Sequence, residues 1–501
     1  MNDIQKKNLE TIYRVLDEVR IYDHACRILQ YDQETICPAE GMEVQGETAA
    51  FLGTKAFELT KQQDFIDAVE ALYPEREALE DYDKTLIDIL HTDYANNKNI
   101  TPEMNHRYAL IYNKAFVAWL EAKKAADFKL FAPSLAEVYQ VEKEKVSLRE
   151  TKFDTVYDSL LNDYETGMTE KDLDACFDAC KARMIPLLQK IMQSKKQIRR
   201  DFMHRMVSDE AQKKMAAWLL EIMGFDFKRG AFTTSEHPFT EIMSQNDVRV
   251  TTHYYADNFS SSMFSIIHEG GHALFEMLQP EENFAHHLDH KTMGQHESVS
   301  RFYENRIGRS EAFVHLIYPK AKELFPEALH DVSEQELYEA LNIVEPSFIR
   351  TEADEFTYTF HVIIRYEIEK ALLLGQVSVE ELPELWNKKY QEYLGITPEN
   401  DKVGVLQDMH WTSGFGYFPT YAIGNMYNAM YYNKMKQEMN LDKLIAEEKI
   451  NKINDWMKEN VFKMADRMDP KVWIKAITGR DFTPDDFLDY LEEKYTKIYE
   501  L

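Results

Sequence analysis

The chain has few of the residues that interrupt regular structure. Only 17 glycines and 15 prolines occur among its 501 residues, about half the usual share of these two types. Few breakers favour long uninterrupted elements, and over residues 104–150 apolar side chains recur at the i, i+3, i+4 spacing of a helix. Strand-forming sequence is confined to residues 247–255. We therefore predict a mostly α fold with one small antiparallel sheet.

The sequence also lacks the features that separate independent domains. No Ser/Gly-rich linker, low-complexity tract or internal repeat divides it, although a chain of this length is long enough for two or three hydrophobic cores. We predict a single domain over residues 1–501, a large helical body whose two lobes flank a deep central cleft.

Cysteines are few, and their spacing excludes the common disulfide and metal motifs. The four residues, Cys26, Cys37, Cys176 and Cys180, contain no CxxC pair. Cys176 and Cys180 have the i, i+4 spacing of one helix face, so we interpret them as reduced core thiols. A second metal site there would need more ligands than the neighbourhood offers.

Acidic residues greatly outnumber basic ones. The chain has 58 Lys and Arg against 87 Asp and Glu, a formal net charge of −29, which would repel a nucleic acid or an anionic membrane. No segment reaches the 18 consecutive apolar residues of a membrane span, and residues 1–15 contain no apolar signal segment. We expect neither partner, and we expect a cytoplasmic protein.

The most informative motif is HEGGH at residues 268–272, inside an apolar stretch. Helical spacing puts His268 and His272 on one face, where both imidazoles can bind one Zn²⁺. Glu269 stands beside them and can take a proton from a metal-activated water. An ordinary core helix with two hydrogen-bonded histidines is the alternative. Because two mid-helix glycines cost stability, we expect another segment or a substrate to pass close to them.

Catalytic zinc usually has a third protein ligand, and candidates follow the motif closely. A helical pattern begins at Glu297, and in it Glu297, Arg301 and Glu304 share one face. We predict that Glu297 is the third ligand. The neighbouring histidines are interpreted as the surface polarity of a loop: His286, His287, His290 and His296.

A short strand is expected just before the zinc-binding helix. Residues 247–255 are rich in β-branched and aromatic types, and residues 256–260 interrupt that pattern. We predict an edge strand, to which an extended peptide can add through main-chain hydrogen bonds. A purely structural hairpin explains the same residues.

Six short motifs follow one another along the chain. They are HPF (237–239), DVRVTT (247–252), HEGGHALFE (268–276), HESVSR (296–301), IRTEAD (349–354) and GVLQDMHW (404–411). Together they resemble the ordered motifs of the Taq-type metallocarboxypeptidase family. The segment YDQET at 31–35 is similar to the family's WDQET, so the resemblance covers essentially the whole chain. Tyr31 replaces the usual Trp, and Val299 replaces a Gln that could support the third ligand by a hydrogen bond.

The resemblance implies a metal site and its base. His268, His272 and Glu297 would bind Zn²⁺, for which Co²⁺ could substitute, and Glu269 would be the general base. It also implies a two-lobed helical fold around a cleft, with the sheet near the active site, and a homodimer.

The resemblance further implies an anchor for the substrate. Arg350 would bind the terminal carboxylate through both oxygens, although helical spacing alone favours an ion pair with Asp354. His410 and Tyr421, or Tyr417 in place of Tyr421, would stabilise the oxyanion of the tetrahedral intermediate.

His237 and Arg249, from the HPF and DVRVTT motifs, would line the substrate cleft or else hold the strand in place. The predicted function is hydrolysis of the C-terminal bond of peptides with a free C-terminus, one amino acid at a time. A related zinc endopeptidase or peptidyl-dipeptidase is the alternative among enzymes. A non-catalytic helical binding protein that contains zinc is the alternative from another class, but a structural site has no use for Glu269.

Overall fold

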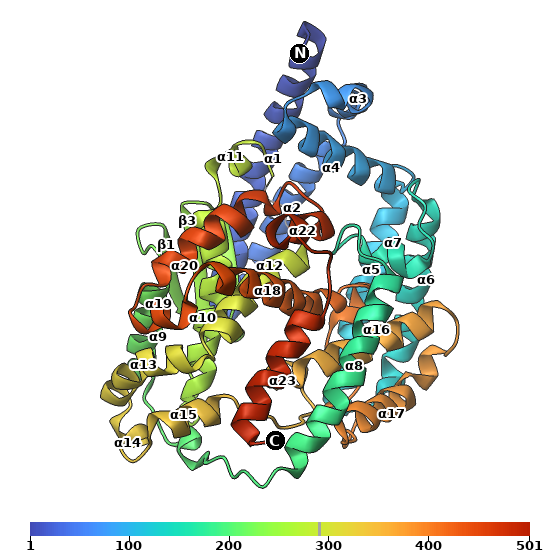
Figure 1. The fold of residues 1–501 in the computed structure, drawn as a ribbon. Helices are drawn as coiled ribbons and strands as arrows, with labels where there is room; N and C mark the ends of the chain where they lie inside the picture. Colours follow the sequence, from blue (N-terminus) through green and yellow to red (C-terminus); the bar gives the residue numbers. More distant parts are fainter. Residues whose placement is uncertain (289–291) are drawn as a thin grey trace.

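The molecule is built almost entirely from helices, with one small sheet (Figure 1). The computed structural model describes residues 1–288 and 292–501. Long helices predominate, among them α1 (Asp3–Thr35), α5 (Pro102–Ala125) and α8 (Glu170–Gln193). The mostly α fold predicted from the scarcity of breakers is confirmed. In the described part of the chain, no helix is both long enough and apolar enough to cross a membrane.

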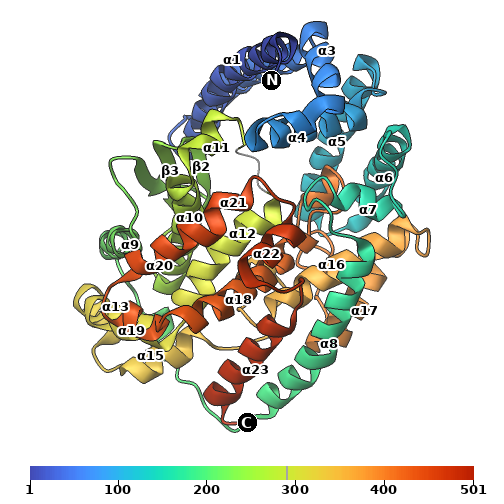
Figure 2. The ribbon, with the colours of Figure 1, turned by 45° about the horizontal axis from the view of Figure 1, so that its top comes forward.

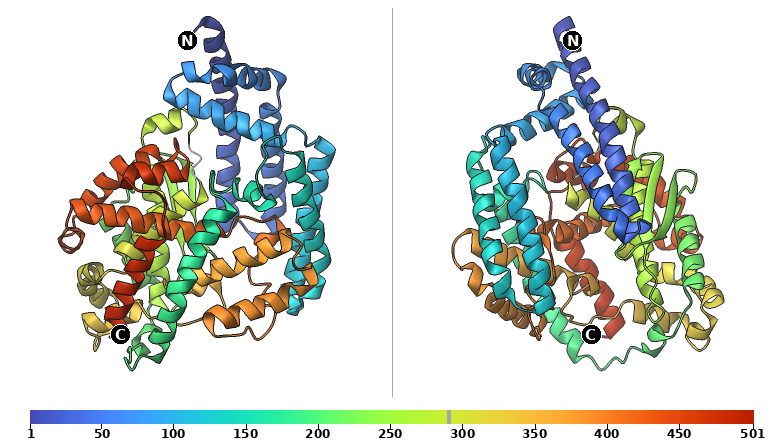
Figure 3. Two further views of the ribbon diagram at one scale, coloured as in Figure 1. Left: turned by 45° about the vertical axis from the view of Figure 1, so that its right-hand side comes forward. Right: turned by 180° about the vertical axis from the view of Figure 1, so that it is seen from behind.

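The first helices form one end of the molecule (Figures 1 and 2). There α1, α2 (Met42–Thr60), α3 (Gln63–Leu72) and α4 (Asp81–Asn97) surround a small hydrophobic cluster that includes Ile12 and Leu72. Leu288 also belongs to it. Figure 3 shows α1 running beside the sheet, where Arg27 Nη1 donates to the carbonyl of Ile242 at 3.1 Å.

The other helices, apart from α11, contribute side chains to a second, much larger hydrophobic cluster. Two separate clusters fit the two lobes predicted from the sequence, whereas the deep cleft and the single-domain organisation stay predictions. The helices not yet named, apart from those of the site, are α6 (Ala132–Leu148), α7 (Val156–Leu161), α9 (Asp209–Met223), α11 (Glu281–Ala285), α13 (Glu311–Leu324), α14 (Pro326–Leu329), α15 (Glu334–Leu341), α16 (Tyr358–Leu373), α17 (Leu382–Leu394), α19 (Leu441–Ala446), α20 (Ile450–Met457), α21 (Lys463–Ala465), α22 (Pro470–Thr478) and α23 (Asp485–Tyr499).

The cysteines are all free, and Cys176 and Cys180 are buried in α8. Their interpretation as core thiols is confirmed. Cys176 Sγ lies 3.0 Å from the sulfur of Met426 in the large cluster, so the pair contributes to packing.

The sheet differs from its prediction in two respects. It has three strands, β1 (Gly230–Thr234), β2 (Thr240–Ser244) and β3 (Asp247–Thr252), in the order β1-β3-β2. β2 pairs antiparallel with β3, but β1 pairs parallel with it, so the sheet is mixed and the antiparallel prediction is wrong for β1. β3 lies in the centre, so the prediction of an edge strand is also wrong. The reason is that β1 and β2 carry weaker strand signals and gain their conformation from pairing with β3.

Three helices cross at the centre of the molecule with almost no space between them. They are α10 (Phe259–Leu278), α12 (Met293–Arg301) and α18 (Pro419–Glu438). A Cβ atom on Gly271 of α10 would lie 2.7 Å from the Cα of Ser300, and one on Gly424 of α18 would lie 3.0 Å from the backbone nitrogen of Ser298. The expectation that another segment passes close to the mid-helix glycines is confirmed: α12 lies against Gly271, and Leu220 and Met223 of α9 lie against Gly270.

The C-terminal helix is fixed to this centre by a buried ion pair network. Glu355 accepts from Arg306 Nη1 at 3.1 Å and from Lys494 Nζ of α23 at 2.6 Å, and the three side chains are 2%, 0% and 7% exposed. Glu355→Ala leaves both cations buried and unpaired. We expect the free energy of unfolding in urea to fall by about 3–5 kcal/mol.

The exposed pair of Glu345 with Arg200 gives the matched control. Glu345→Ala should change the free energy of unfolding by less than about 1 kcal/mol. Equal effects of the two substitutions would show that the Glu355 network does not stabilise the fold.

Candidate metal centre

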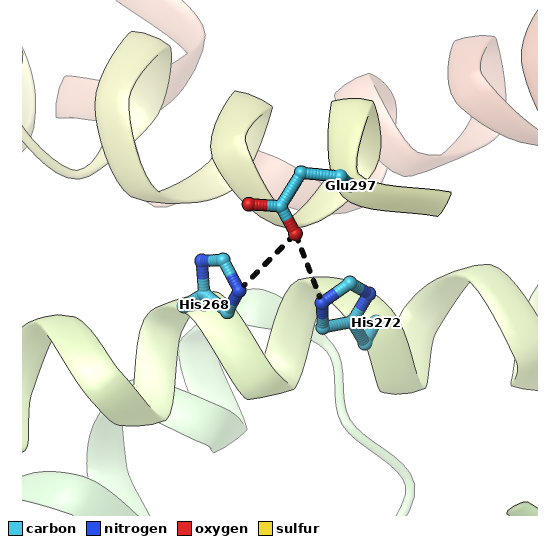
Figure 4. Close-up of side chains that lie close together, drawn as sticks. All are labelled: His268, His272 and Glu297. Carbon is cyan, nitrogen blue, oxygen red and sulfur yellow. Dashed lines mark ion pairs between the residues drawn. The ribbon is translucent and has the colours of Figure 1, made fainter. Parts of the chain in front are cut away.

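Three predicted ligands meet between α10 and α12 (Figure 4). Nε2 of His268 and Nε2 of His272 each lie 3.6 Å from Oε2 of Glu297, and the three ligand atoms are all within 4.8 Å of one another. In a tetrahedral zinc site with bonds of about 2.0–2.1 Å, neighbouring ligand atoms are about 3.3 Å apart. The donor set and its spacing therefore fit Zn²⁺. Within residues 1–288 and 292–501 no other group of His, Cys, Asp and Glu is arranged in this way.

The local sequence explains how each helix presents its ligands. α12 begins with a capping box, in which Gln295 N donates to Thr292 Oγ1 and Thr292 N donates to Gln295 Oε1. Its continuation over Phe302–Ile307 is π-helical, a geometry that recurs at functional sites. This wider turn places Glu304 against His268, with 2.9 Å between Oε2 and Nδ1.

Arg301 binds two carboxylates of the site, that of the predicted ligand Glu297 and that of Glu304, which contacts His268. Its Nε donates to Glu297 Oε1 at 2.8 Å and its Nη1 to Glu304 Oε2 at 3.0 Å. Ser300 Oγ, 3.3 Å from Glu297 Oε2, adds a further contact. The predicted third ligand, Glu297, is thus held by its neighbours in the chain, although Val299, fully buried, offers no hydrogen bond.

Neighbouring positive charge keeps the carboxyl groups of Glu297 and Glu304 ionised. Burial disfavours ionisation of Glu297, but His268 and Arg301 outweigh it and hold the pKa of this carboxyl well below its usual value. Burial and Arg301 oppose one another in the same way at Glu304, where the net effect lowers the pKa to about 2. Both side chains are therefore carboxylates at neutral pH.

The predicted base is held by a residue that the sequence did not indicate. Thr240 Oγ1, on β2, lies 2.6 Å from Oε2 and 3.0 Å from the backbone oxygen of Glu269. Thr240 directly follows the HPF motif, but no local pattern shows that β2 lies against α10. This contact fixes the rotamer of Glu269 beside the two imidazoles.

The interpretation of the following histidines as loop polarity is wrong for three of them. His296 stacks on His272 with 4.4 Å between ring centroids, and Nε2 of His296 lies 2.9 Å from Glu276 Oε1. His286 bonds to the hydroxyl of Tyr13 at 2.6 Å, and His287 is 8% exposed. His290 lies outside the described residues. These rings pack against helices because distant segments cover them, which spacing alone cannot reveal.

A second cluster surrounds Arg350, which is buried. Arg350 begins a short 3-10 turn rather than a helix, and it pairs with Asp408, with Nη2 3.0 Å from Oδ1. Asp354 instead accepts from the backbone of Phe356 and Thr357, so the alternative ion pair of Arg350 with Asp354 is wrong. Arg365 Nε donates to the other oxygen of Asp408 at 2.6 Å. Two guanidinium groups share one carboxylate, which leaves the cluster with excess positive charge.

His410, Tyr417 and Tyr421 lie together beside Arg350. Nε2 of His410 is 3.3 Å from the hydroxyl of Tyr421, and the rings of Tyr417 and Tyr421 have centroids 5.2 Å apart. Arg350 lies over the Tyr421 ring at 4.7 Å. Burial, helped by the charges of Arg350 and Arg365, lowers the pKa of His410 to about 4. His410 is therefore a neutral imidazole at neutral pH and can donate or accept a hydrogen bond.

One aromatic ring links this cluster to the metal centre. The guanidinium of Arg301 lies 4.3 Å from the ring centroid of Tyr358, and the hydroxyl of Tyr358 accepts from Arg350 Nη1 at 3.1 Å. The predicted anchor is therefore connected to Glu297 through two residues, Tyr358 and Arg301.

The last two predicted site residues lie in the sheet region. Arg249 on β3 donates from Nε and Nη2 to the carboxylate of Asp247, at 2.9 and 2.7 Å, and lies 5.1 Å from the Tyr31 ring. His237 is exposed between β1 and β2. The contacts of Arg249 fit the alternative of holding the strand in place, and a role of either residue toward substrate stays a prediction.

Metal affinity tests the importance of Glu304. Glu304→Gln keeps the shape of the side chain but removes the charge that polarises His268, so we expect zinc affinity to fall by about 10–100-fold in a chelator competition assay. Glu334→Gln is the matched control, because Glu334 makes the same kind of bond, 3.0 Å long, to the exposed His315. Equal zinc affinity of both variants and the parent would contradict the expected role of Glu304.

Two imidazoles one helical turn apart, a carboxylate from a second helix and an adjacent glutamate define the metal centre of an HExxH metallopeptidase. The model of the carboxypeptidase Taq (M32) metallopeptidase family matches residues 11–495. The chain belongs to this family and is a metallocarboxypeptidase, a peptide hydrolase that acts at the C-terminus. The resemblance seen in the six motifs is thereby confirmed.

Relatives match over nearly their full length. Carboxypeptidase 1 of Bacillus subtilis is 37% identical over 490 residues, covering 97% of this chain and 98% of its own. Thermostable carboxypeptidase 1 of Thermus thermophilus is 35% identical, covering 94% of each chain. The crystal structure of the M32 carboxypeptidase from Deinococcus radiodurans R1 has a TM-score of 0.95 at 29% identity, covering 99% of this chain and 100% of that one.

Proposed function

We propose that this chain removes single amino acids from the C-terminus of peptides with Zn²⁺ at His268, His272 and Glu297, and with Glu269 as the general base. The observation that carries the proposal is the convergence of these three ligand atoms beside a glutamate held by Thr240. A zinc ion bound there would make water more acidic and polarise the scissile carbonyl. Co²⁺ prefers the same donor types and is a substitute in this proposal.

Glu269 moves the proton. Its carboxylate accepts a proton from the attacking water and passes it to the leaving amine. The hydrogen bond from Thr240 keeps one oxygen engaged, so the other is oriented toward the water. The base therefore does not have to be reoriented during the reaction.

Arg350 binds the terminal carboxylate of the substrate in this proposal. Arg350 and Arg365 both pair with one carboxylate, that of Asp408, which leaves one positive charge unbalanced. The terminal carboxylate of a substrate would balance it. His410 and Tyr421 stabilise the oxyanion that forms at the scissile carbonyl, with Tyr417 as the alternative tyrosine. The support for these roles is that both side chains lie beside Arg350.

The edge strand available for an extended peptide is β2. Phe239 O accepts from Thr251 N, so by alternation the backbone of Thr240 faces away from β3. The same residue contacts Glu269, which supports pairing of the substrate main chain with Thr240. His237 and Arg249 are proposed as the borders of this part of the cleft.

Mass-spectrometric tracking of one peptide with added zinc tests the function. Loss of one residue mass per step from the C-terminus is expected. Loss of two residues per step would indicate a peptidyl-dipeptidase, and internal fragments would indicate an endopeptidase. Zinc bound without any hydrolysis would support the non-catalytic alternative.

We further propose a cytoplasmic homodimer. The free cysteines support a reducing compartment. Exposed apolar side chains on two helices support self-association: Val44, Phe51 and Phe57 on α2, and Leu110, Val117 and Leu120 on α5. Light scattering after size-exclusion chromatography should give twice the 58.9 kDa mass of the chain, and a monomer at micromolar concentration would contradict the dimer.

A further inference from the structure

Helix α16 directs two charged side chains at the segment that carries His410 and Tyr417. Arg365 and Glu369 are one turn apart on this helix, and both are almost fully buried. Arg365 binds Asp408, two residues before His410. Glu369 has no role in the proposed mechanism, yet its carboxylate accepts hydrogen bonds from this segment and from α7.

We propose that Glu369 is a positioning residue that holds the 410–417 segment in place, and with it His410 and the alternative oxyanion tyrosine, Tyr417. This inference rests on the proposed function, because it requires that His410 and one of the two tyrosines stabilise the oxyanion. Glu369 itself is 1% exposed and would not touch substrate.

The carboxylate binds both ends of the segment at once. Its Oε1 accepts from Trp411 Nε1 at 2.8 Å, and Trp411 directly follows His410. Its Oε2 accepts from the backbone nitrogen of Gly416 at 3.1 Å, and Gly416 directly precedes Tyr417. One side chain therefore fixes the spacing between His410 and Tyr417.

The far side of the segment leaves no room for it to shift. Gly416 has a φ of +93°, and a Cβ there would lie 3.0 Å from the backbone of Leu160 and Leu161 at the end of α7. From the same helix, the Tyr157 hydroxyl donates to Glu369 Oε2 at 3.0 Å. The turn at Gly416 is thus held between α7 and α16.

Only a carboxylate satisfies all three donors. The indole N–H of Trp411 and the backbone N–H of Gly416 can donate but cannot accept. Burial raises the pKa of Glu369 to about 7, while these donors and Arg365 act in the opposite direction. Glutamine at this position keeps the shape, but in either orientation its NH₂ group must face one of the two N–H groups. Glu369→Gln should therefore release one end of the segment.

The experiment measures kcat and KM of the metal-loaded Glu369→Gln variant and compares them with those of a control variant and of two variants of the proposed oxyanion groups. A displaced oxyanion group should lower kcat by about 10–100-fold, whereas KM, governed by Arg350, should change by less than about threefold. Tyr157→Phe is the matched control, because it removes one donor and leaves both ends of the segment bound; its kcat should stay within about twofold. His410→Ala and Tyr421→Phe are assayed in parallel.

The results distinguish failure of the positioning role of Glu369 from failure of the proposed oxyanion groups. Loss of kcat in His410→Ala or Tyr421→Phe, together with normal kcat in Glu369→Gln, overturns the positioning role alone. Normal kcat in both His410→Ala and Tyr421→Phe overturns the proposed oxyanion groups. An equal loss in Tyr157→Phe and Glu369→Gln shows a general packing effect and also overturns the inference. If Glu369→Gln does not fold, Trp411→Phe decides, and unchanged kcat in that variant rejects the proposal.

Discussion

Glu269→Gln is expected to bind zinc as the parent enzyme does and to lose peptidase activity, with kcat lower by about 10²–10⁴-fold. Glutamine has the same shape as glutamate, so its Oε1 can still accept the hydrogen bond from Thr240 Oγ1. What it cannot do is take a proton from water and transfer it to the leaving amine. Metal content by plasma mass spectrometry and hydrolysis of an N-blocked dipeptide measure the two properties separately.

Thr240→Val provides a graded comparison for this result. It keeps the base but removes the hydrogen bond that orients it, so a loss smaller than that of Glu269→Gln is expected, at unchanged metal content. Bound metal with near-normal turnover in Glu269→Gln would remove Glu269 from the mechanism. An equal loss in both variants would indicate that orientation, rather than proton transfer, limits the reaction.

Amidation of the substrate's C-terminus should lower kcat/KM by at least about 100-fold in the unmodified enzyme. The amide is neutral, so Arg350 loses a charge-assisted hydrogen bond worth about 1.5–3 kcal/mol and the coulombic attraction that accompanies it. The buried guanidinium then keeps Asp408 and Tyr358 as its hydrogen-bond partners among the described residues. Comparing one peptide as acid and amide measures this effect without altering the protein.

The same pair of substrates tests whether Arg350 is the group responsible. Arg350→Gln should cleave acid and amide at similar low rates, because the charge that distinguishes them is gone. Continued strong preference for the acid in this variant would assign the anchor to another cation, with Arg365 the nearest on Asp408. Efficient cleavage of the amide by the parent would favour an endopeptidase cleft, through which the chain continues.

Local pattern was sufficient to predict the centre of the site. The spacing of His268 and His272 and the helical face shared by Glu297, Arg301 and Glu304 depend on one helix at a time, so they follow from 3.6-residue periodicity. The mostly α fold likewise follows from composition. The proximity of Glu297 to the two imidazoles needed one further step, the crossing of two helices that Gly271 makes close.

Contacts between distant segments were beyond this kind of prediction. Thr240 and Glu269 come from different elements, and Asp408 is 58 residues from Arg350. The place of β3 in the middle of the sheet depends on strands with weak signals of their own. Glu369 gave no signal because a single acidic residue in a helix is ordinarily solvated, and its burial becomes apparent only when the 410–417 segment packs on it.

The close packing of α10, α12 and α18 at Gly271 and Gly424 makes catalysis depend on the packing of the core. His268 and His272, two of the three proposed metal ligands, lie on α10, and the third, Glu297, lies on α12, at a contact too close for a methyl group. Warming that loosens this contact would separate the three side chains from one another. Peptidase activity and the packing of the core should therefore be lost over the same temperature range. Added zinc should raise that temperature, because it binds the folded state.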